Sequence, residues 1–187
     1  LQRPYYPSAL FSSVYHNQLQ QRYLKRLIPV SLDVPDDKER SDNLGRLLED
    51  SRGKIWITSL VNGVYEFNPD SRKVVHYGHE SGNNNSIGSD VIRTVAEDAN
   101  GKIWFGGNRG CLSIFDTNSR SFENLFPDYS RPHLLASNRV WSLKADKRGN
   151  MWVATDVGLY QFDCRNKKPS IVKLYTAADG LQADLAT

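Results

Sequence analysis

A unit of 48 residues occurs three times in the sequence, and this repeat limits the possible folds more than any other feature. Trp56, Trp104 and Trp152 occupy the same position in successive copies, 48 residues apart. Each of them ends a segment of the form Asp-x-x-Gly-x-(Ile/Met)-Trp. A period of about 40 to 50 residues is typical of β-propeller blades, each of which is a four-stranded sheet. The repeat therefore predicts an all-β propeller.

Each copy contains four short apolar segments, which in the first copy lie at residues 44–48, 55–58, 64–67 and 74–77. Segments of about five residues between turn residues are typical of strands. In the Asp-x-x-Gly turn, Asp is expected to accept hydrogen bonds from backbone N–H groups and Gly to adopt a positive φ. The three equivalent Trp side chains are expected to pack between blades rather than to form a sugar-stacking surface.

The repeat also predicts how the chain is organised. Complete blade repeats are expected at residues 41–88, 89–136 and 137–180. Residues 1–40 match weakly and are interpreted as the degenerate end of a preceding blade, with its last two strands over residues 9–29. An amphipathic helix over residues 13–28, forming a helical extension, is the alternative. Residues 181–187 would begin another blade, so we expect partial blades at both ends, or a half-propeller that closes by dimerisation.

Composition excludes several functions. The net charge of +3 comes from 24 basic and 21 acidic residues scattered along the chain, without the basic clusters typical of nucleic-acid binding. Cys111 and Cys164 form neither a disulfide framework nor a metal motif; we interpret Cys111 as a buried hydrophobic residue and Cys164 as a free thiol. The histidines lack the spacing of zinc ligands. We therefore expect no cofactor, no metal and no nucleic-acid partner.

The repeat resembles a known family. The Asp-x-x-Gly-x-(Ile/Met)-Trp segment is followed by Gly-(Val/Leu)-Tyr-x-Phe-(Asn/Asp), as in residues 63–68 and 158–163. Over residues 41–187 this pattern is similar to the two-component regulator propeller repeat. The resemblance implies a fragment of a larger, seven-bladed propeller in the periplasmic sensor region of a hybrid two-component system histidine kinase. It also implies an oligosaccharide ligand, control of carbohydrate-utilisation genes, contacts with the remainder of the sensor chain, and a homodimeric parent protein.

Two other classes of function remain alternatives to this non-enzymatic sensor. A carbohydrate-active propeller enzyme, either a lyase or a hydrolase, would need ionisable residues converging at one mouth of the channel. A protein-interaction or dimerisation propeller would show an exposed apolar edge.

Loop residues that differ between copies are the candidates for ligand binding, because scaffold positions must repeat and binding positions need not. Loops between the second and third strands should share one face with the connections between blades. The first strand of a blade lies nearest the axis, so Arg93 and Trp141 could line the channel there, with core packing as the alternative for Trp141. Arg109 and Arg131 could bind acidic sugars while Tyr129 stacks on a ring. The complete candidate set is Asn62, His79, Arg93, Asn108, Arg109, Tyr129, Arg131, His133, Trp141 and Asp156.

Overall fold

The computed structural model describes residues 43–108, 112–127, 135, 137 and 139–181. These residues form three four-stranded antiparallel sheets, which confirms the predicted propeller blades. The partial blades or helix expected within residues 1–40, and the blade expected to begin at 181–187, fall almost wholly outside the described residues. The exact blade boundaries stay predictions.

Each sheet is a simple meander whose strands lie in chain order. The first sheet contains β1 (Leu44–Glu49), β2 (Ile55–Ser59), β3 (Val64–Asn68) and β4 (Lys73–Tyr77). The second contains β5 (Ile92–Glu97), β6 (Ile103–Gly107), β7 (Leu112–Asp116) and β8 (Ser121–Leu125). The third contains β9 (Val140–Ala145), β10 (Asn150–Thr155), β11 (Leu159–Asp163) and β12 (Ser170–Tyr175), followed by a 3-10 turn, η2 (Ala177–Asp179).

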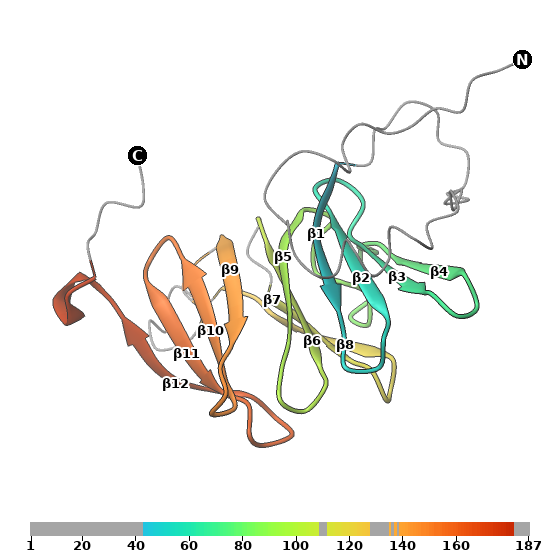
Figure 1. Cartoon of the computed structure of the whole chain (residues 1–187). Coiled ribbons are helices and arrows are strands. Elements are labelled where there is room, and N and C mark those ends of the chain that lie inside the picture. The colour runs from blue at the N-terminus through green and yellow to red at the C-terminus, as the bar shows by residue number, and fades with distance from the viewer. Residues whose placement is uncertain (1–42, 109–111, 128–134, 136, 138, 182–187) are drawn as a thin grey trace, which may run out of the picture.

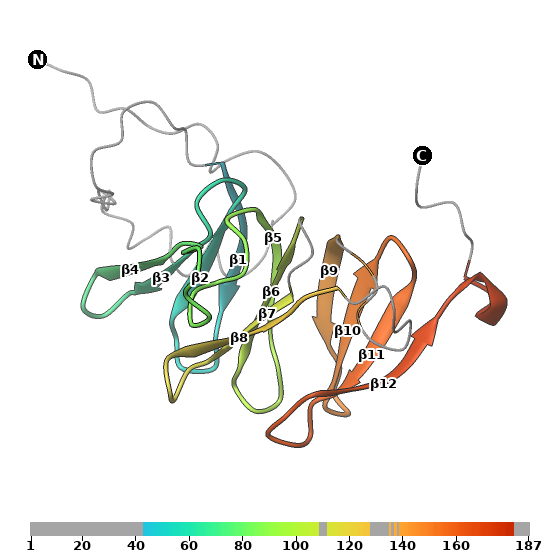
Figure 2. The same ribbon diagram turned by 180° about the vertical axis from the view of Figure 1, so that it is seen from behind.

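The sheets are arranged like a fan, with the first strand of each on the inside. Strand β5 contacts both β1 and β9, whereas β4, β8 and β12 lie towards the outside (Figures 1 and 2). The row β1, β5, β9 therefore follows the axis of the propeller. Among the described residues there is no helix whose length and hydropathy would let it span a bilayer.

A hydrogen-bonded turn connects the first two strands of every sheet. In the second sheet, Oδ1 of Asp98 accepts the backbone N–H groups of Asn100 and Lys102 at 2.8 and 3.0 Å. Its Oδ2 accepts the indole N–H of Trp104 at 2.9 Å. The same three bonds join Asp50 to Arg52, Lys54 and Trp56, and Asp146 to Arg148, Asn150 and Trp152. The predicted capping by Asp is confirmed, and the bond to Trp explains why both residues recur together.

Packing of the indole ring between neighbouring sheets was predicted for all three copies, and the structure confirms it for two of them. Trp56 contacts Phe115 of the second sheet at a centroid distance of 5.3 Å, and Trp104 contacts Phe162 of the third sheet at the same distance. These two Trp side chains are 1% and 0% exposed. The first two blades therefore each bury their Trp against the aromatic residue on the third strand of the next blade.

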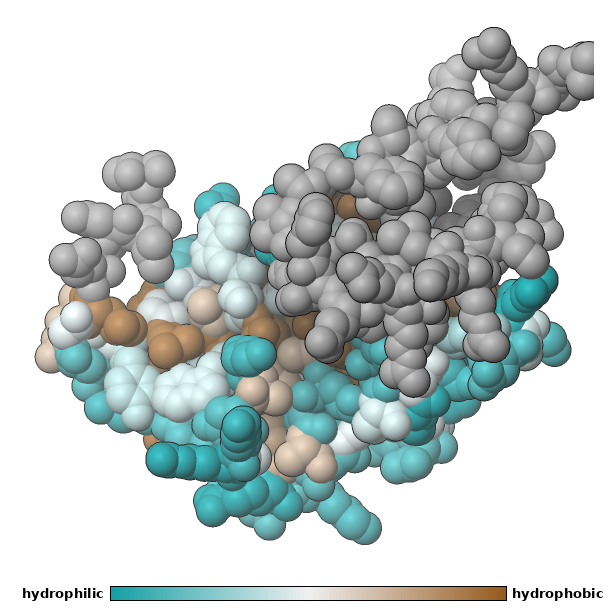
Figure 3. Space-filling view, in the orientation of Figure 1, coloured by the Kyte–Doolittle hydropathy of each residue, from teal (hydrophilic) through white to brown (hydrophobic). Residues whose placement is uncertain are grey.

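The third sheet differs, because Trp152 remains partly exposed and its ring packs on Tyr175 of its own sheet. Most of the visible described surface is hydrophilic, and its apolar residues lie mainly over this sheet (Figure 3). Val157, Val172 and Leu181 are among the exposed hydrophobic residues there. Exposed apolar side chains thus gather around the third sheet on the face that Figure 3 shows.

Cys164 is a free and fully buried cysteine in the turn after β11. Burial, followed by the negative charge of Asp98, raises the pKa of its thiol to about 12. The side chain is therefore protonated at neutral pH and packs as a small hydrophobic residue. The predicted free thiol is confirmed, whereas Cys111 lies outside the described residues.

The Asp–Trp turn should contribute strongly to stability. Replacing Asp98 by Ala leaves the buried indole N–H of Trp104 and two backbone N–H groups without their acceptor, which we expect to cost about 3 kcal/mol. Urea unfolding followed by circular dichroism measures the loss. Asp70→Ala is the control, because Asp70 is exposed and its carboxylate makes no hydrogen bond to the described residues. Equal losses in the two variants would contradict this assignment.

The same turn predicts a dependence on pH. Hydrogen bonds from the Asn150 side chain, the Asn150 backbone and Trp152 hold the pKa of Asp146 well below its ordinary value. A lowered pKa means that the ionised carboxylate stabilises the folded state. This contribution to the free energy of unfolding is complete above the pKa of Asp in the unfolded chain, about 4, and decreases as the pH falls below that value. Asp146→Asn should therefore lower the melting temperature at pH 7, and its difference from the wild type should shrink between pH 4 and pH 3. A constant difference would contradict the assignment.

Candidate functional site

The innermost strand of the second sheet contains a β-bulge. Ile92 pairs with Gly107 and Thr94 pairs with Gly106, so Arg93 is an extra residue without a partner in the ladder. A bulge of this kind changes the direction of a side chain and is frequent next to functional sites. The side chain of Arg93 therefore does not have to follow the alternation of side chains between the two faces of the sheet.

The third sheet contains the corresponding bulge. Val140 pairs with Thr155 and Ser142 pairs with Ala154, which leaves Trp141 as the extra residue. Its side chain is 46% exposed, although the neighbouring Val140 is buried. The first sheet has a register shift in the same place, between Leu44 and Leu47.

The bulges fall at one position of the repeat. Gly45, Arg93 and Trp141 are spaced by 48 residues and belong to the three innermost strands. Scaffold residues such as the Asp and Trp of the turn are the same in all copies, whereas this position differs in every copy. An extra residue in a bulge has no cross-strand partner, so pairing in the ladder does not determine its identity.

Two of these bulge residues meet beside a loop amide. The guanidinium carbon of Arg93 lies 5.9 Å from the centroid of the Trp141 ring, within the range of a cation–π interaction. Nε of Arg93 donates a hydrogen bond to Oδ1 of Asn108 at 3.1 Å. We call Arg93, Asn108 and Trp141 the axial cluster. All three were predicted as candidate ligand-binding residues, and the structure brings them together.

Close contact between the second and third sheets positions the axial cluster. A Cβ atom at Gly106 would lie 2.4 Å from Cγ1 of Val140, so a side chain there would push β9 away from β6. Glycine at this position lets Val140 pack against the second sheet, and Trp141 follows directly in the chain. The absence of a side chain at Gly106 therefore helps to set the distance between Arg93 and Trp141.

The predicted sharing of one face by two sets of loops is confirmed for the described residues. The backbone N–H of Gly63 donates to the carbonyl of Asp90 at 2.8 Å, and that of Asn108 donates to the carbonyl of Val91 at 3.2 Å. The loops between the second and third strands therefore lie against the connections between blades. Asn108 also pairs with Arg139 through an isolated antiparallel bridge.

The other candidates do not join the axial cluster. The carbonyl oxygen of Asn62 lies 2.6 Å from Nε2 of His76, and Asp156 accepts a hydrogen bond from the hydroxyl of Ser137. Nδ1 of His79 lies 2.9 Å from the carbonyl oxygen of Ile87, a contact inside its own loop. The remaining four candidates fall outside the described residues; they are Arg109, Tyr129, Arg131 and His133.

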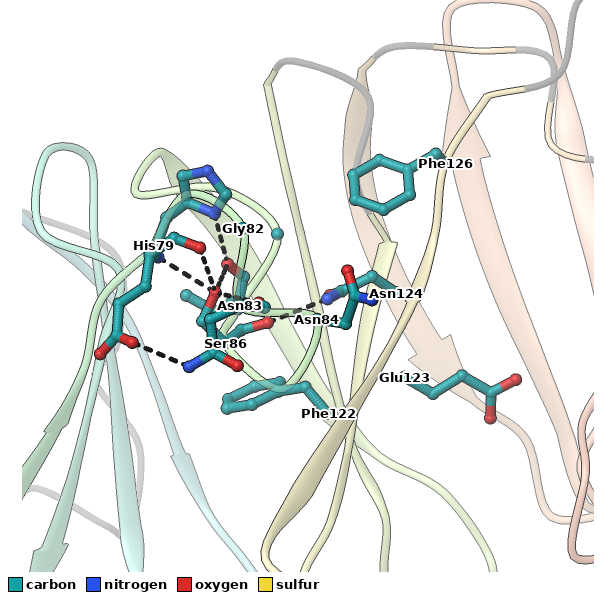
Figure 4. A pocket seen from close by; sticks show the side chains of 12 residues that line it. His79, Gly82, Asn83, Asn84, Ser86, Phe122, Glu123, Asn124 and Phe126 are labelled. Atoms are coloured by element: carbon teal, nitrogen blue, oxygen red, sulfur yellow. Dashed lines mark hydrogen bonds between the residues drawn. The ribbon is translucent and has the colours of Figure 1, made fainter.

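His79 instead borders a pocket of about 410 Å³ between the β4–β5 connection and strand β8. Figure 4 shows His79, Asn83 and Ser86 on one side of it, with Asn124 and Phe126 on the other. Several of its polar groups already bind protein atoms. Nδ2 of Asn124 donates to the carbonyl of Ser86 at 2.9 Å, and Nδ2 of Asn83 donates to Glu80 at 2.8 Å. These groups hold the loop in place and have less capacity left for a ligand.

Arg139 belongs near the axial cluster but was missed by the sequence analysis. Its side chain is exposed, and its backbone pairs with Asn108. The sequence did contain an indication, because a charged residue here replaces the apolar Val91 at the equivalent position of the preceding copy. Within the described part of the chain, no group of three or more His, Cys, Asp or Glu side chains is arranged to hold a metal ion.

Comparison with known proteins identifies the repeats. The family model for the two-component regulator propeller matches residues 86–109 and 134–157. No curated protein sequence matches the chain. Among solved structures, the extracellular domain assigned to the one-component system BT4673 of B. thetaiotaomicron is 26% identical, with a TM-score of 0.55. The match covers 71% of this chain and 16% of that one.

Two further structures agree with this fold. The extracellular domain assigned to the hybrid two-component system BT3049 of B. thetaiotaomicron is 26% identical, with a TM-score of 0.54, over 70% of this chain and 17% of that one. Virginiamycin B lyase from Staphylococcus aureus is 11% identical, with a TM-score of 0.52, over 76% and 45% of the two chains, and shows the fold alone. This chain spans about one sixth of the length of the two extracellular domains. Residues 86–109 and 134–157 are thus identified as two-component regulator propeller repeats, and the fold of this chain is that of extracellular domains of one- and two-component systems.

Proposed function

We propose that this chain is part of the ligand-sensing, extracytoplasmic propeller of a hybrid two-component regulator and binds an oligosaccharide at the axial cluster. The observation that carries the proposal is the exposed ring of Trp141 beside the guanidinium of Arg93, which Asn108 holds in place. A sugar ring has an apolar face of C–H groups and a rim of hydroxyls. An aromatic ring suits the face, and guanidinium and amide groups suit the hydroxyls.

The family context supports a sensory role. Similar solved structures are extracellular domains of one- and two-component systems, which fits a periplasmic location for this chain. In this proposal, ligand binding at the propeller changes the arrangement of the sensor chain and thereby controls genes for carbohydrate utilisation. The partners are the oligosaccharide, the remainder of the same sensor chain and a second copy of the parent protein; nucleic acid is not among them.

We propose binding rather than catalysis at this end of the propeller. The repeated carboxylates of Asp50, Asp98 and Asp146 accept hydrogen bonds within their own turns, so they serve the scaffold. The axial cluster combines a cation, an amide and an aromatic ring, none of which is a common general base at neutral pH. Recognition is the chemistry that these three groups support best.

Removing the Trp141 ring should weaken binding of an oligosaccharide while leaving the fold intact. We expect Trp141→Ala to raise the dissociation constant about fivefold, because stacking on an aromatic ring contributes about 1 kcal/mol. Isothermal titration calorimetry of the full chain against a panel of neutral and acidic oligosaccharides measures the effect. The unfolding midpoint should change little, since the side chain is half exposed.

Phe126→Ala is the matched control, because Phe126 is an exposed aromatic residue that borders the pocket at β8 instead of the axis. This variant should bind as the wild type does. A loss of binding in Phe126→Ala with normal binding in Trp141→Ala would move the site to the pocket. Absence of binding to every oligosaccharide would overturn the proposed function.

A further inference from the structure

We infer that the oligosaccharide bound at the axial cluster is acidic, with its carboxylate or sulfate held by Arg93 and Arg139. This inference rests on the proposed function and names the chemical class of its ligand. It follows from two arginines that each interact with Asn108, one through its side chain and one through its backbone, and that have no ion-pair partner among the described residues.

Arg93 has hydrogen-bonding capacity left over. Its Nε donates to the amide oxygen of Asn108, which carries no charge, and its two Nη groups make no hydrogen bond to the described residues. The bond to Asn108 fixes the plane of the guanidinium. Within the described chain, both Nη groups can therefore bind a carboxylate or sulfate with two parallel hydrogen bonds.

Arg139 brings a second positive charge to the same place. It pairs with Asn108 through an antiparallel bridge, and residues paired in this way project their side chains to the same side, with Cβ atoms about 5 Å apart. The side chain of Asn108 reaches Arg93, so Arg139 extends from the same side as this contact. The side chain of Arg139 is exposed and makes no ion pair with any described residue.

Asp156 lies near Arg139 but forms no ion pair with it among the described residues. Asp156 accepts a hydrogen bond from the hydroxyl of Ser137, and Ser137 in turn binds the backbone of Arg139. Asp156 therefore holds the segment before β9 and forms no ion pair with either arginine within the described chain. Arg93 and Arg139 thus bring two positive charges to the axial cluster beside the exposed Trp141 ring, which favours a negatively charged ligand.

The test compares ligands that differ only in charge. The full chain is titrated by calorimetry with acidic tetrasaccharides, for example tetragalacturonate, and with their methyl esters, which retain the sugar rings but lose the charge. We expect the acid to bind at least about tenfold more tightly than its ester, and to lose most of this advantage in Arg93→Gln and in Arg139→Gln. The affinity for the acid should also fall as NaCl is raised from low concentration to 0.5 M.

Arg148→Gln is the control, because Arg148 is an exposed arginine in the turn at the opposite ends of β9 and β10. It should bind the acid as the wild type does. If acid and ester bind the wild type equally, or if Arg93→Gln weakens both alike, the inference fails while the proposed function stands. If no saccharide binds, the proposed function and this inference fail together.

Discussion

The hydrogen bond between the turn Asp and the indole N–H of Trp is the interaction on which this structure depends. At Asp98 a single carboxylate closes the turn between β5 and β6 and holds Trp104 in the orientation that the next sheet requires. Without an acceptor, the indole N–H would be buried and unsatisfied, which is costly in a protein interior. The Asp98 side chain thus both closes the turn and orients the Trp that packs between blades. Because Asp and Trp repeat together, the same arrangement links each turn to its own Trp in all three sheets.

Sequence reasoning was strongest where a physical requirement repeats. The spacing of Trp56, Trp104 and Trp152 predicted the three sheets. It also predicted packing of the indole rings between blades, which the structure shows for Trp56 and Trp104. The bulges were not predicted, since a register shift depends on which backbone groups pair and leaves only a faint pattern in a strand of six residues. Aligning the copies nevertheless placed Arg93 and Trp141 at the same position of the repeat, and these two residues are in contact in the structure.

The weakest predictions concerned loop residues. Asn62, His79 and Asp156 differ between copies, as a ligand-binding residue would, but in the structure each makes contacts that shape its own loop or a neighbouring one. Variation in a loop reflects either recognition or local turn chemistry, and the sequence does not separate the two. Arg139 illustrates the opposite case, because it replaces an apolar residue of the preceding copy at a position where the backbone bridge to Asn108 brings it beside the axial cluster.

In the proposed function, the Trp residues of the turns hold the blades together, whereas Trp141 contacts the ligand. The indole N–H groups of Trp56, Trp104 and Trp152 all bind Asp carboxylates, whereas that of Trp141 makes no hydrogen bond to the described residues. A ¹H–¹⁵N spectrum of the indole groups, recorded during titration with a bound oligosaccharide, tests the distinction directly. The account predicts that the Trp141 signal shifts while the other three stay in place. A stationary Trp141 signal at saturation would contradict it.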